Sequence, residues 1–168
     1  MSDIPIVKVA IVGDANVGKT SLVRRFSDGK FQQSRVATLG ADFQTKVVSL
    51  PRGDVKLSIW DMGGQKQFEP VRRVFYSGTA ASALVYDMTS LESLKNLEIW
   101  REELLTETKN QNFVVVGNKA DLDSEVYEEA GERLAEIFKA KHFITSAFDG
   151  RGVEEMFDEL ARLAVGNY

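Results

Sequence analysis

The sequence predicts an α/β domain in three layers, in which helices cover both faces of a mostly parallel six-stranded sheet that has one antiparallel edge strand. Three observations support this fold class. Strand-like runs rich in β-branched residues alternate with amphipathic helical stretches, about five in number, along the chain. A glycine-rich loop stands between the first strand and the first helix. The length of 168 residues suits one domain, here residues 1–168, with a single buried core.

The glycine-rich loop, residues 13–20, is the strongest motif in the chain. It reads Gly-Asp-Ala-Asn-Val-Gly-Lys-Thr and fits the phosphate-loop pattern G-x-x-x-x-G-K-S/T at every constrained position. Its glycines allow backbone N–H groups to converge on a phosphate, Lys19 adds a positive charge, and Thr20 offers a hydroxyl to Mg²⁺. Residues 6–12 before it are strand-like and residues 21–26 after it form an amphipathic helix, as the motif requires. We therefore expect a nucleotide site here rather than a turn that binds nothing.

Composition limits the compartment and the partners. The chain has no cysteine, which excludes disulfides, thiolate metal sites and cysteine-linked lipids, and Ser2 excludes myristoylation. The sequence shows no signal peptide and no apolar run long enough to span a membrane. A net charge of −4 and a pI near 5.2 argue against nucleic-acid binding, so a small nucleotide is the expected ligand. We expect a cytoplasmic monomer with no lipid anchor in this sequence, peripheral at membranes through partners.

The first half of the chain continues with a loop and a hairpin. Residues 30–41 are polar and lack periodicity, which predicts a loop. Residues 42–50 and 55–60 alternate in polarity around a cluster of turn residues, so they predict two antiparallel strands. The second strand ends at Asp61. An aspartate after an apolar strand is the Walker B arrangement, which sets a carboxylate beside the phosphate-bound Mg²⁺.

The second half alternates helices and strands. Residues 62–65 cannot form regular structure, and the polar run to residue 77 predicts an irregular helix. Thr89 or Ser90 is expected to cap a long helix with apolar residues at helical spacing. The remaining elements are strands at 81–87, 113–117 and 142–145 and helices at about 124–141 and 153–164. In such a sheet ligands bind at the carboxyl ends of the strands, where the glycine- and asparagine-bearing segments fall.

Several short segments resemble, in the same order, the Ras superfamily of small GTPases. They are the phosphate loop, Thr38, residues 60–65 (Trp-Asp-Met-Gly-Gly-Gln), residues 118–121 (Asn-Lys-Ala-Asp) and residues 145–147 (Thr-Ser-Ala). The resemblance covers nearly the whole chain and implies the G-domain form of the P-loop NTPase fold. It also implies a switch that binds GTP or GDP with Mg²⁺ and hydrolyses GTP, in signalling or vesicle trafficking. Residues 85–90 are most similar to Rab proteins, whereas the double glycine is similar to the Arf and Gα branches.

The choice of guanine follows from chemistry as well as from the resemblance. Guanine presents an N1–H and an exocyclic amine side by side, and the Asp121 carboxylate can accept from both, whereas adenine has no such pair of donors. The resemblance implies that Asn118 and Lys119 contact the base. It also implies that the Ala147 N–H meets the guanine carbonyl and that Phe31 lies against the base edge. The expected nucleotide-binding residues are Asp14, Ala15, Asn16, Val17, Gly18, Lys19, Thr20, Ser21, Phe31, Thr38, Gly64, Asn118, Lys119, Asp121, Ser146, Ala147 and Phe148.

The resemblance also implies which residues hold the metal and support hydrolysis. Thr20, Thr38 and Asp61 are the expected Mg²⁺ residues. The Gly64 N–H is expected to reach the γ-phosphate and Gln65 to orient the attacking water. The loops that carry Thr38 and Gly64 would then order with the triphosphate and relax after hydrolysis. The expected catalytic residues are Gln65, Arg35, Lys19 and Gly64.

Arg35 is the candidate most particular to this chain. It stands three residues before Thr38, where Ras and Rab proteins usually carry an aromatic residue. It resembles the Gα arginine that stabilises the transition state from within the same chain. A solvated Arg35 without a catalytic role is the alternative. At Ala15 some relatives have glycine, and a Cβ there would crowd an arginine delivered by a partner protein.

Two other classes of function stay open at this point. A guanine-nucleotide scaffold that hardly hydrolyses GTP would signal by occupancy alone, and Gln65 argues against it. A P-loop kinase or ATPase that acts on adenylates is disfavoured by Asp121 and by the absence of a second lysine- or arginine-rich lid segment. Effector, exchange-factor and GTPase-activating proteins are expected to bind near residues 35–43 and 65–76.

Overall fold

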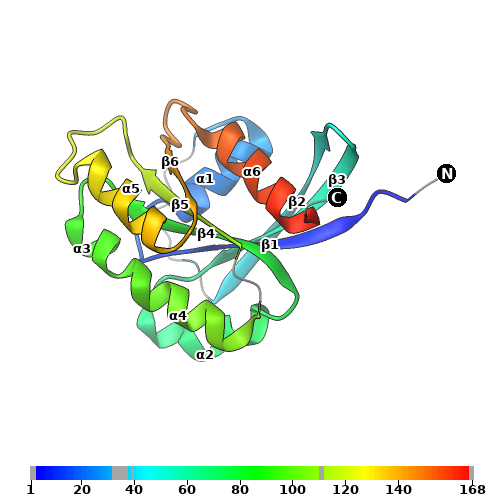
Figure 1. The fold of residues 1–168 in the computed structure, drawn as a ribbon, viewed down its shortest axis with the longest axis horizontal. Coiled ribbons are helices and arrows are strands. Elements are labelled where there is room, and N and C mark those ends of the chain that lie inside the picture. The colour runs from blue at the N-terminus through cyan, green and yellow to red at the C-terminus, as the bar shows by residue number, and fades with distance from the viewer. Residues whose placement is uncertain (1–2, 32–37, 39, 110–111, 167–168) are drawn as a thin grey trace.

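A six-stranded sheet lies at the centre of the molecule, with helices on both of its faces (Figure 1). The structure is a computed structural model that describes residues 3–31, 38, 40–109 and 112–166. Its strands are β1 (Ile6–Val12), β2 (Ala41–Leu50), β3 (Gly53–Met62), β4 (Thr79–Asp87), β5 (Phe113–Asn118) and β6 (Lys141–Ile144). They lie in the order β2-β3-β1-β4-β5-β6. The edge strand β2 runs antiparallel to β3, whereas the other neighbours are parallel, so the predicted fold class is confirmed.

The central strands bury both of their faces, which produces two separate cores. In β1, Val9 and Ile11 belong to one core, and Ala10 and Val12 belong to the other. This division follows from the two-residue period of a strand, which turns successive side chains to opposite faces. It also explains why β1, β4 and β5 are almost continuously apolar in sequence, since parallel strands between two helical layers expose neither face to water.

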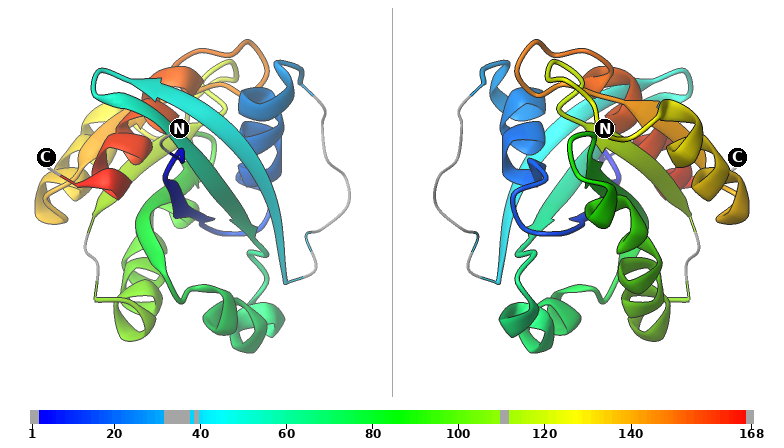
Figure 2. Two further views of the ribbon diagram at one scale, coloured as in Figure 1. Left: turned by 90° about the vertical axis from the view of Figure 1, so that its right-hand side faces the viewer. Right: turned by 90° about the vertical axis from the view of Figure 1, so that its left-hand side faces the viewer.

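The helices divide between the two faces, as Figure 2 shows from two sides. Their bounds are α1 (Lys19–Asp28), α2 (Glu69–Phe75), α3 (Leu91–Lys95), α4 (Leu97–Glu107), α5 (Glu128–Ile137) and α6 (Val153–Val165). Helices α1 and α6 cover one face, where Phe26 stacks on Phe157 with ring centroids 4.1 Å apart. The predicted irregular helix is a 3-10 turn, η1 (Lys66–Phe68), that leads into α2. None of the helices in the described ranges is long and apolar enough to cross a membrane.

The prediction of a single long helix after residue 90 is wrong, because the chain forms two helices, α3 and α4, with a break at Asn96. Ser90 caps α3, since its Oγ accepts a hydrogen bond from the Ser93 N–H at 3.3 Å. The Asn96 side chain donates to the Asp14 carboxylate, far away in sequence. Asparagine is unfavourable inside a helix, because its side chain can hydrogen-bond to the backbone in non-helical conformations, and it is favoured at helix ends. A tertiary contact of this kind cannot be read from the helical spacing alone.

Helix α5 is shorter than the helix expected at 124–141. The N–H groups of Glu125 and Val126 donate to the Met88 carbonyl at 2.9 and 3.1 Å, so the start of this segment bonds to the end of β4 instead of forming a helical turn. At the other end Lys139 has a φ of +55°, in the left-handed region, which an α-helix does not contain. The helix therefore stops before it, and β6 begins directly afterwards.

Candidate functional site

Loops at the carboxyl ends of the parallel strands enclose a cavity of about 550 Å³. Most of the predicted site residues line it: Ala15, Asn16, Gly18, Lys19, Thr20, Ser21, Phe31, Thr38, Gly64, Gln65, Asn118, Lys119, Asp121, Ala147 and Phe148. Met62 and Leu122 also line it and were not expected from the sequence. The cavity lies where a doubly wound sheet binds its ligand, because the strands deliver their following loops to the same edge.

Three of the residues expected to contact the nucleotide, Asp14, Val17 and Ser146, are not among the residues that line the cavity. Val17 is 2% exposed and packs in the core. Ser146 is fully buried, and its hydroxyl donates to Oδ1 of Asp121 at 2.8 Å. The carboxylate of Asp14 bonds to side chains of the α3–α4 region. The sequence pattern did not predict these side-chain contacts, which each residue makes within the protein.

Lys19 is buried at the start of α1, with 6% of its surface exposed. Its ammonium donates to the carbonyls of Gly13 and Asp14 at 2.8 and 2.7 Å. Burial lowers the pKa of Lys19 to about 8, although the Asp61 and Asp14 carboxylates oppose this shift. The preceding Gly18 has a φ of +98°, and a Cβ there would lie 2.3 Å from Nδ2 of Asn118. The loop therefore presents a desolvated cation and a helix N-terminus, both of which favour a phosphate.

Two hydroxyls and one carboxylate converge beside Lys19. The Oγ1 atoms of Thr20 and Thr38 are 3.0 Å apart. The Thr20 hydroxyl donates to Oδ2 of Asp61, and the Thr38 hydroxyl lies 3.4 Å from the same atom. Burial raises the pKa of Asp61, while the hydrogen bond from Thr20 and the charge of Lys19 oppose this.

The other carboxylate oxygen of Asp61, Oδ1, is buried and has no hydrogen-bond partner among the described residues. A buried acceptor without a donor is costly unless a cation or water binds it. Mg²⁺ prefers such hard oxygen ligands and commonly takes one or two carboxylates together with phosphates. The residues therefore fit a Mg²⁺ ion. In the part of the chain that the structure describes, no group of three or more histidine, cysteine, aspartate or glutamate side chains forms an all-protein metal cage.

Asn118, at the end of β5, connects two loops of the site. It is 1% exposed, and its Nδ2 donates to the Val17 carbonyl at 3.0 Å. Its Oδ1 accepts from the Thr145 hydroxyl at 3.1 Å. Both polar ends of this side chain thus bind protein, which fixes the phosphate loop against the loop that follows β6.

Lys119 extends along the cavity from a backbone with a φ of +67°. Its ammonium donates to the Asn16 carbonyl at 2.7 Å and lies 3.0 Å from Oδ2 of Asp87. Asp87 is 8% exposed and accepts at Oδ1 from the N–H and hydroxyl of Thr89. Sequence reasoning missed Asp87. The sequence could have indicated Asp87 in the same way as Asp61, because both are acidic residues at the carboxyl end of a buried strand.

Two aromatic rings stand at the mouth of the cavity. Phe31 and Phe148 meet edge to face, with centroids 5.3 Å apart. They remain 37% and 60% exposed. Rings in this position offer an apolar surface to a planar base, and a bound base would shield them from water.

The double glycine after β3 is required by close backbone packing. A Cβ at Gly63 would lie 2.5 Å from the Thr38 carbonyl, and the Gly63 N–H donates to the Gly40 carbonyl at 2.7 Å. A Cβ at Gly64 would lie 2.5 Å from the Ala15 nitrogen. The segments that carry Thr38, the two glycines and the phosphate loop therefore meet backbone to backbone.

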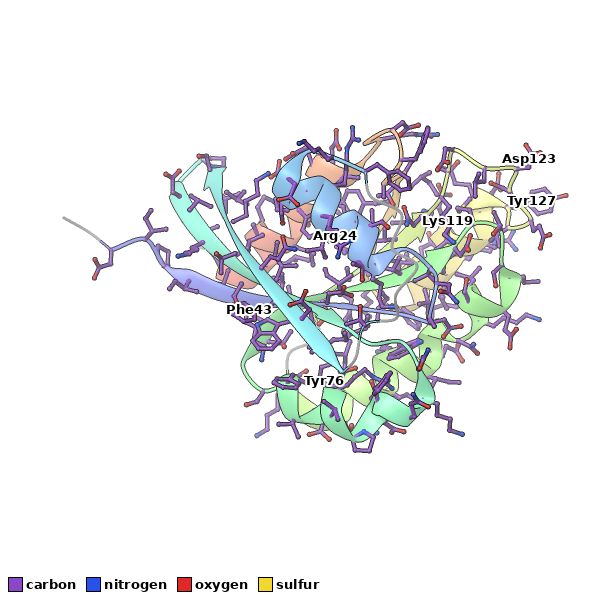
Figure 3. All side chains as sticks on the ribbon, turned by 180° about the vertical axis from the view of Figure 1, so that it is seen from behind. Arg24, Phe43, Tyr76, Lys119, Asp123 and Tyr127 are labelled. Atoms are coloured by element: carbon purple, nitrogen blue, oxygen red, sulfur yellow. The ribbon has the colours of Figure 1, made fainter. Side chains whose placement is uncertain are left out.

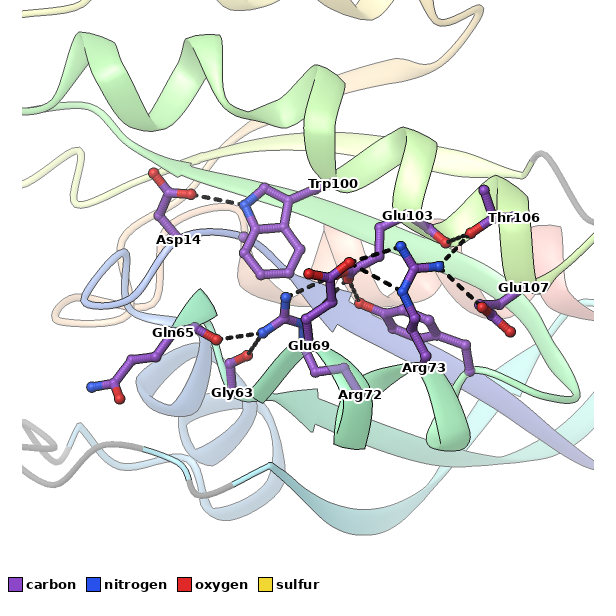
Figure 4. A network of polar contacts seen from close by, with 12 residues as sticks. Asp14, Gly63, Gln65, Glu69, Arg72, Arg73, Trp100, Glu103, Thr106 and Glu107 are labelled. Atoms are coloured by element: carbon purple, nitrogen blue, oxygen red, sulfur yellow. Dashed lines mark hydrogen bonds and ion pairs between the residues drawn. The ribbon is translucent and has the colours of Figure 1, made fainter. Parts of the chain in front are cut away.

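Of the two remaining catalytic candidates, the structure describes Gln65 and does not describe Arg35. Gln65 lines the cavity, and its Oε1 accepts from Nε2 of Gln67 at 3.1 Å. Its backbone carbonyl accepts from Arg72, a buried residue that the sequence did not single out (Figure 4). Arg35 lies outside the described residues.

Comparison with known proteins agrees with this geometry. A family model described as the Ras family matches residues 8–165. The chain is 40% identical to the Ras-related protein Rab7 of Pisum sativum, over 95% of this chain and 82% of the relative. It is 38% identical to the Ras-related protein RAB1BV of Beta vulgaris, over 94% of this chain and 75% of the relative. It is 39% identical to the Ras-related protein RABG3f of Arabidopsis thaliana, over 95% of this chain and 82% of the relative.

Proposed function

Since the chain belongs to the Ras family of small GTPases, we propose that it is a GTP-operated switch whose cavity holds guanine nucleotide together with Mg²⁺. Binding of guanine nucleotide and hydrolysis of GTP follow from the family. The assignment of these roles to particular residues rests on one observation. The phosphate loop, the Asp121 carboxylate and the Thr20–Thr38–Asp61 cluster all border the same cavity or contact its lining.

The phosphate end of the site is formed by the loop at residues 13–20. Lys19 and the N-terminus of α1 neutralise the β- and γ-phosphates, and the loop N–H groups bind their oxygens. Thr20, Thr38 and Asp61 would hold Mg²⁺, whose charge would neutralise the phosphate oxygens. The Oδ1 atom of Asp61 supports this assignment, because it is buried and finds no hydrogen-bond partner in the part of the chain that the structure describes.

The base end selects guanine. Asp121 accepts from the N1–H and the amine of guanine, and the hydrogen bond from Ser146 holds its carboxylate in place. Lys119 lays its stem along the base while Asp87 and the Asn16 carbonyl hold its ammonium. Phe31 and Phe148 cover the base edge.

Hydrolysis requires a positioned water and a stabilised transition state. Gln65 orients the attacking water, the Gly64 N–H binds the γ-phosphate, and Arg35 stabilises the departing charge from within the chain. A loose phosphoryl-transfer transition state needs this positioning more than it needs a strong base.

The two loops around Thr38 and Gly64 form the switch, and partners bind beside them. Phe43 of β2 is 55% exposed and stacks on Trp60 at 5.1 Å, and Trp60 stacks on Phe75 at 5.2 Å. Figure 3 labels Phe43 on the hairpin, well away from Lys119 at the base end of the site. The proposed surface for effectors, exchange factors and activating proteins consists of residues 35–43 and 65–76, which include Phe43 and Phe75. Relatives named Rab support a role in membrane trafficking, with peripheral attachment through partners.

A direct test compares guanine and adenine nucleotides. The nucleotide that copurifies with the protein should be GDP or GTP, and single-turnover assays with Mg²⁺ should show hydrolysis of GTP and none of ATP. Equal affinity for ATP and GTP would contradict the guanine assignment. GTP that binds tightly and is not hydrolysed would instead support a scaffold that signals by occupancy.

A further inference from the structure

Trp100 of α4 connects the phosphate loop to the segment after β3 (Figure 4). Its indole N–H donates to Oδ1 of Asp14 at 2.8 Å. Asn96 donates to the other oxygen of the same carboxylate, also at 2.8 Å. The Trp100 ring covers the Arg72 guanidinium, with 4.4 Å between Cζ and the ring centroid, and only 6% of Trp100 is exposed. One side chain therefore contacts both an anion of the phosphate loop and a cation of α2.

Arg72 is held from several directions. It is 3% exposed, and its Nη1 donates to the carbonyls of Gly63 and Gln65 at 2.9 and 2.6 Å. Its Nε and Nη2 donate to the two carboxylate oxygens of Glu103 at 3.2 and 2.8 Å. The Tyr76 hydroxyl also donates to Glu103. A planar guanidinium with both edges engaged and one face covered has little freedom to rotate.

The contact of Arg72 with the Gly63 carbonyl fixes the orientation of the Gly64 N–H. The Gly63 carbonyl and the Gly64 N–H belong to one planar trans peptide, in which the two groups point in opposite directions. When Arg72 binds the carbonyl, the N–H is turned to the opposite side of the peptide. Gly64 itself lies against the phosphate loop, since a Cβ there would be 2.5 Å from the Ala15 nitrogen and 2.7 Å from the Gly13 carbonyl oxygen.

We propose that Trp100 is a positioning residue for GTP hydrolysis, a role that rests on the function proposed above. By binding Asp14 through its N–H and Arg72 through its ring, Trp100 keeps the phosphate loop and the Gly63–Gly64 peptide in a constant relative orientation. The Gly64 N–H then meets the γ-phosphate at a productive angle. Hydrogen bonds weaken steeply with misalignment, and small displacements at a reacting centre reduce rates strongly. Trp100 itself does not line the cavity, so it acts on the reaction only through these neighbours.

Trp100→Phe tests the inference most sharply, because phenylalanine keeps a ring over Arg72 and loses only the N–H and part of the ring. We expect single-turnover hydrolysis of bound GTP to slow by about tenfold. The affinity for GTP relative to GDP should fall as well, because only GTP carries the γ-phosphate. The affinity for GDP itself should stay within about twofold of wild type, since its phosphates meet the same Lys19 and loop N–H groups.

A second pair of variants changes the other end of the connection. Arg72→Lys removes the planar fork and should slow hydrolysis and lower the GTP preference in the same way. Arg101→Lys is the matched control. Arg101 neighbours Trp100 on α4, and its guanidinium covers the ring of Phe138 at 4.9 Å. It does not line the cavity, so this control should hydrolyse GTP at the wild-type rate.

The readouts separate positioning from stability. A purely structural role would lower the Tm of Trp100→Phe and leave its hydrolysis rate and its GTP-to-GDP preference at wild-type values, which would overturn the inference. If Trp100→Phe does not fold, the test rests on Arg72→Lys. Hydrolysis of GTP by Arg72→Lys at the wild-type rate would then overturn the inference. A wild-type protein that does not hydrolyse GTP would contradict the proposed function itself, and the inference with it.

Discussion

The Ser146 hydroxyl donates to Oδ1 of Asp121 at 2.8 Å, from a position that is fully buried. The bond fixes the carboxylate at the wall of the cavity. An ionised carboxylate has about four lone-pair sites, so Asp121 can accept from Ser146 and still accept both guanine donors. Ser146, which was expected to contact the nucleotide, thus holds the Asp121 carboxylate that we propose selects the base.

Asp121→Asn should weaken GTP binding by about a hundredfold, because two charge-assisted hydrogen bonds are lost. The preference should turn toward xanthosine triphosphate, whose additional carbonyl can accept from the new amide. Competition binding with the two nucleotides measures both effects. Ser146→Ala is the control. It should lose less GTP affinity than Asp121→Asn and should keep the preference for guanine. Comparable GTP affinity in wild type and Asp121→Asn would remove the guanine assignment.

Thr20→Asn should produce a protein that favours GDP or no nucleotide. The substitution removes a hydroxyl that lies 3.0 Å from Thr38 and bonds to Asp61, and Mg²⁺ matters most for the triphosphate. Affinities for GTP and GDP should be compared with Mg²⁺ and with a chelator. Chelation should weaken GTP binding to wild type and have little effect on the variant. An unchanged GTP-to-GDP ratio in the variant would mean that the metal lies elsewhere.

Gln65→Leu should keep GTP bound and slow its hydrolysis by at least about tenfold, because leucine cannot orient a water molecule. Single-turnover hydrolysis and nucleotide affinity should be measured on the same preparation. Turnover at the wild-type rate would show that another group positions the water.

Arg35→Ala should slow intrinsic GTP hydrolysis by at least about tenfold, which corresponds to some 1.4 kcal/mol, without weakening GTP binding. Arg35→Lys should recover little of this loss, since a point charge lacks the planar fork of a guanidinium. The assay must contain no partner protein. Identical rates in wild type and Arg35→Ala would identify Arg35 as a solvated loop residue.

The contact between buried Tyr86 and half-buried His142 predicts a pH dependence of the free energy of unfolding. The Tyr86 hydroxyl lies 2.8 Å from Nε2 of His142. Burial lowers the pKa of His142 from its usual 6.5, although the Glu128 charge opposes this, and burial raises the pKa of the Tyr86 hydroxyl. The neutral histidine ring can therefore accept from a tyrosine that stays protonated.

Between the lowered folded pKa of His142 and 6.5, the unfolded chain binds more protons than the folded protein. The contribution of this group to the free energy of unfolding is full above pH 6.5 and declines as the pH falls toward the folded value. Urea unfolding across this window should show the decline in wild type and a flatter profile in His142→Gln. The same pH dependence of the free energy of unfolding in wild type and His142→Gln would show that His142 is not its cause.

Several elements of this fold could be predicted, because residues close together in the sequence determine them. The apolar runs of β1, β4 and β5, the hairpin of β2 and β3, and the glycine pattern of the phosphate loop each depend on neighbouring residues. The shortened α5 and the break at Asn96 were not predicted, because in both places backbone or side-chain groups bond to segments far away in the chain.

The sequence by itself determined the chemistry that this site can offer: a lysine and a hydroxyl after a glycine-rich loop, an aspartate after β3, and Asn-Lys-Ala-Asp after β5. Only the tertiary structure decided which groups support that chemistry. It placed Asp87 against Lys119, Ser146 against Asp121, and Trp100 between Asp14 and Arg72. These pairs are far apart along the chain, and no local pattern connects them. Each exists because burial leaves a charged or polar group with no water, and the fold must then supply a partner.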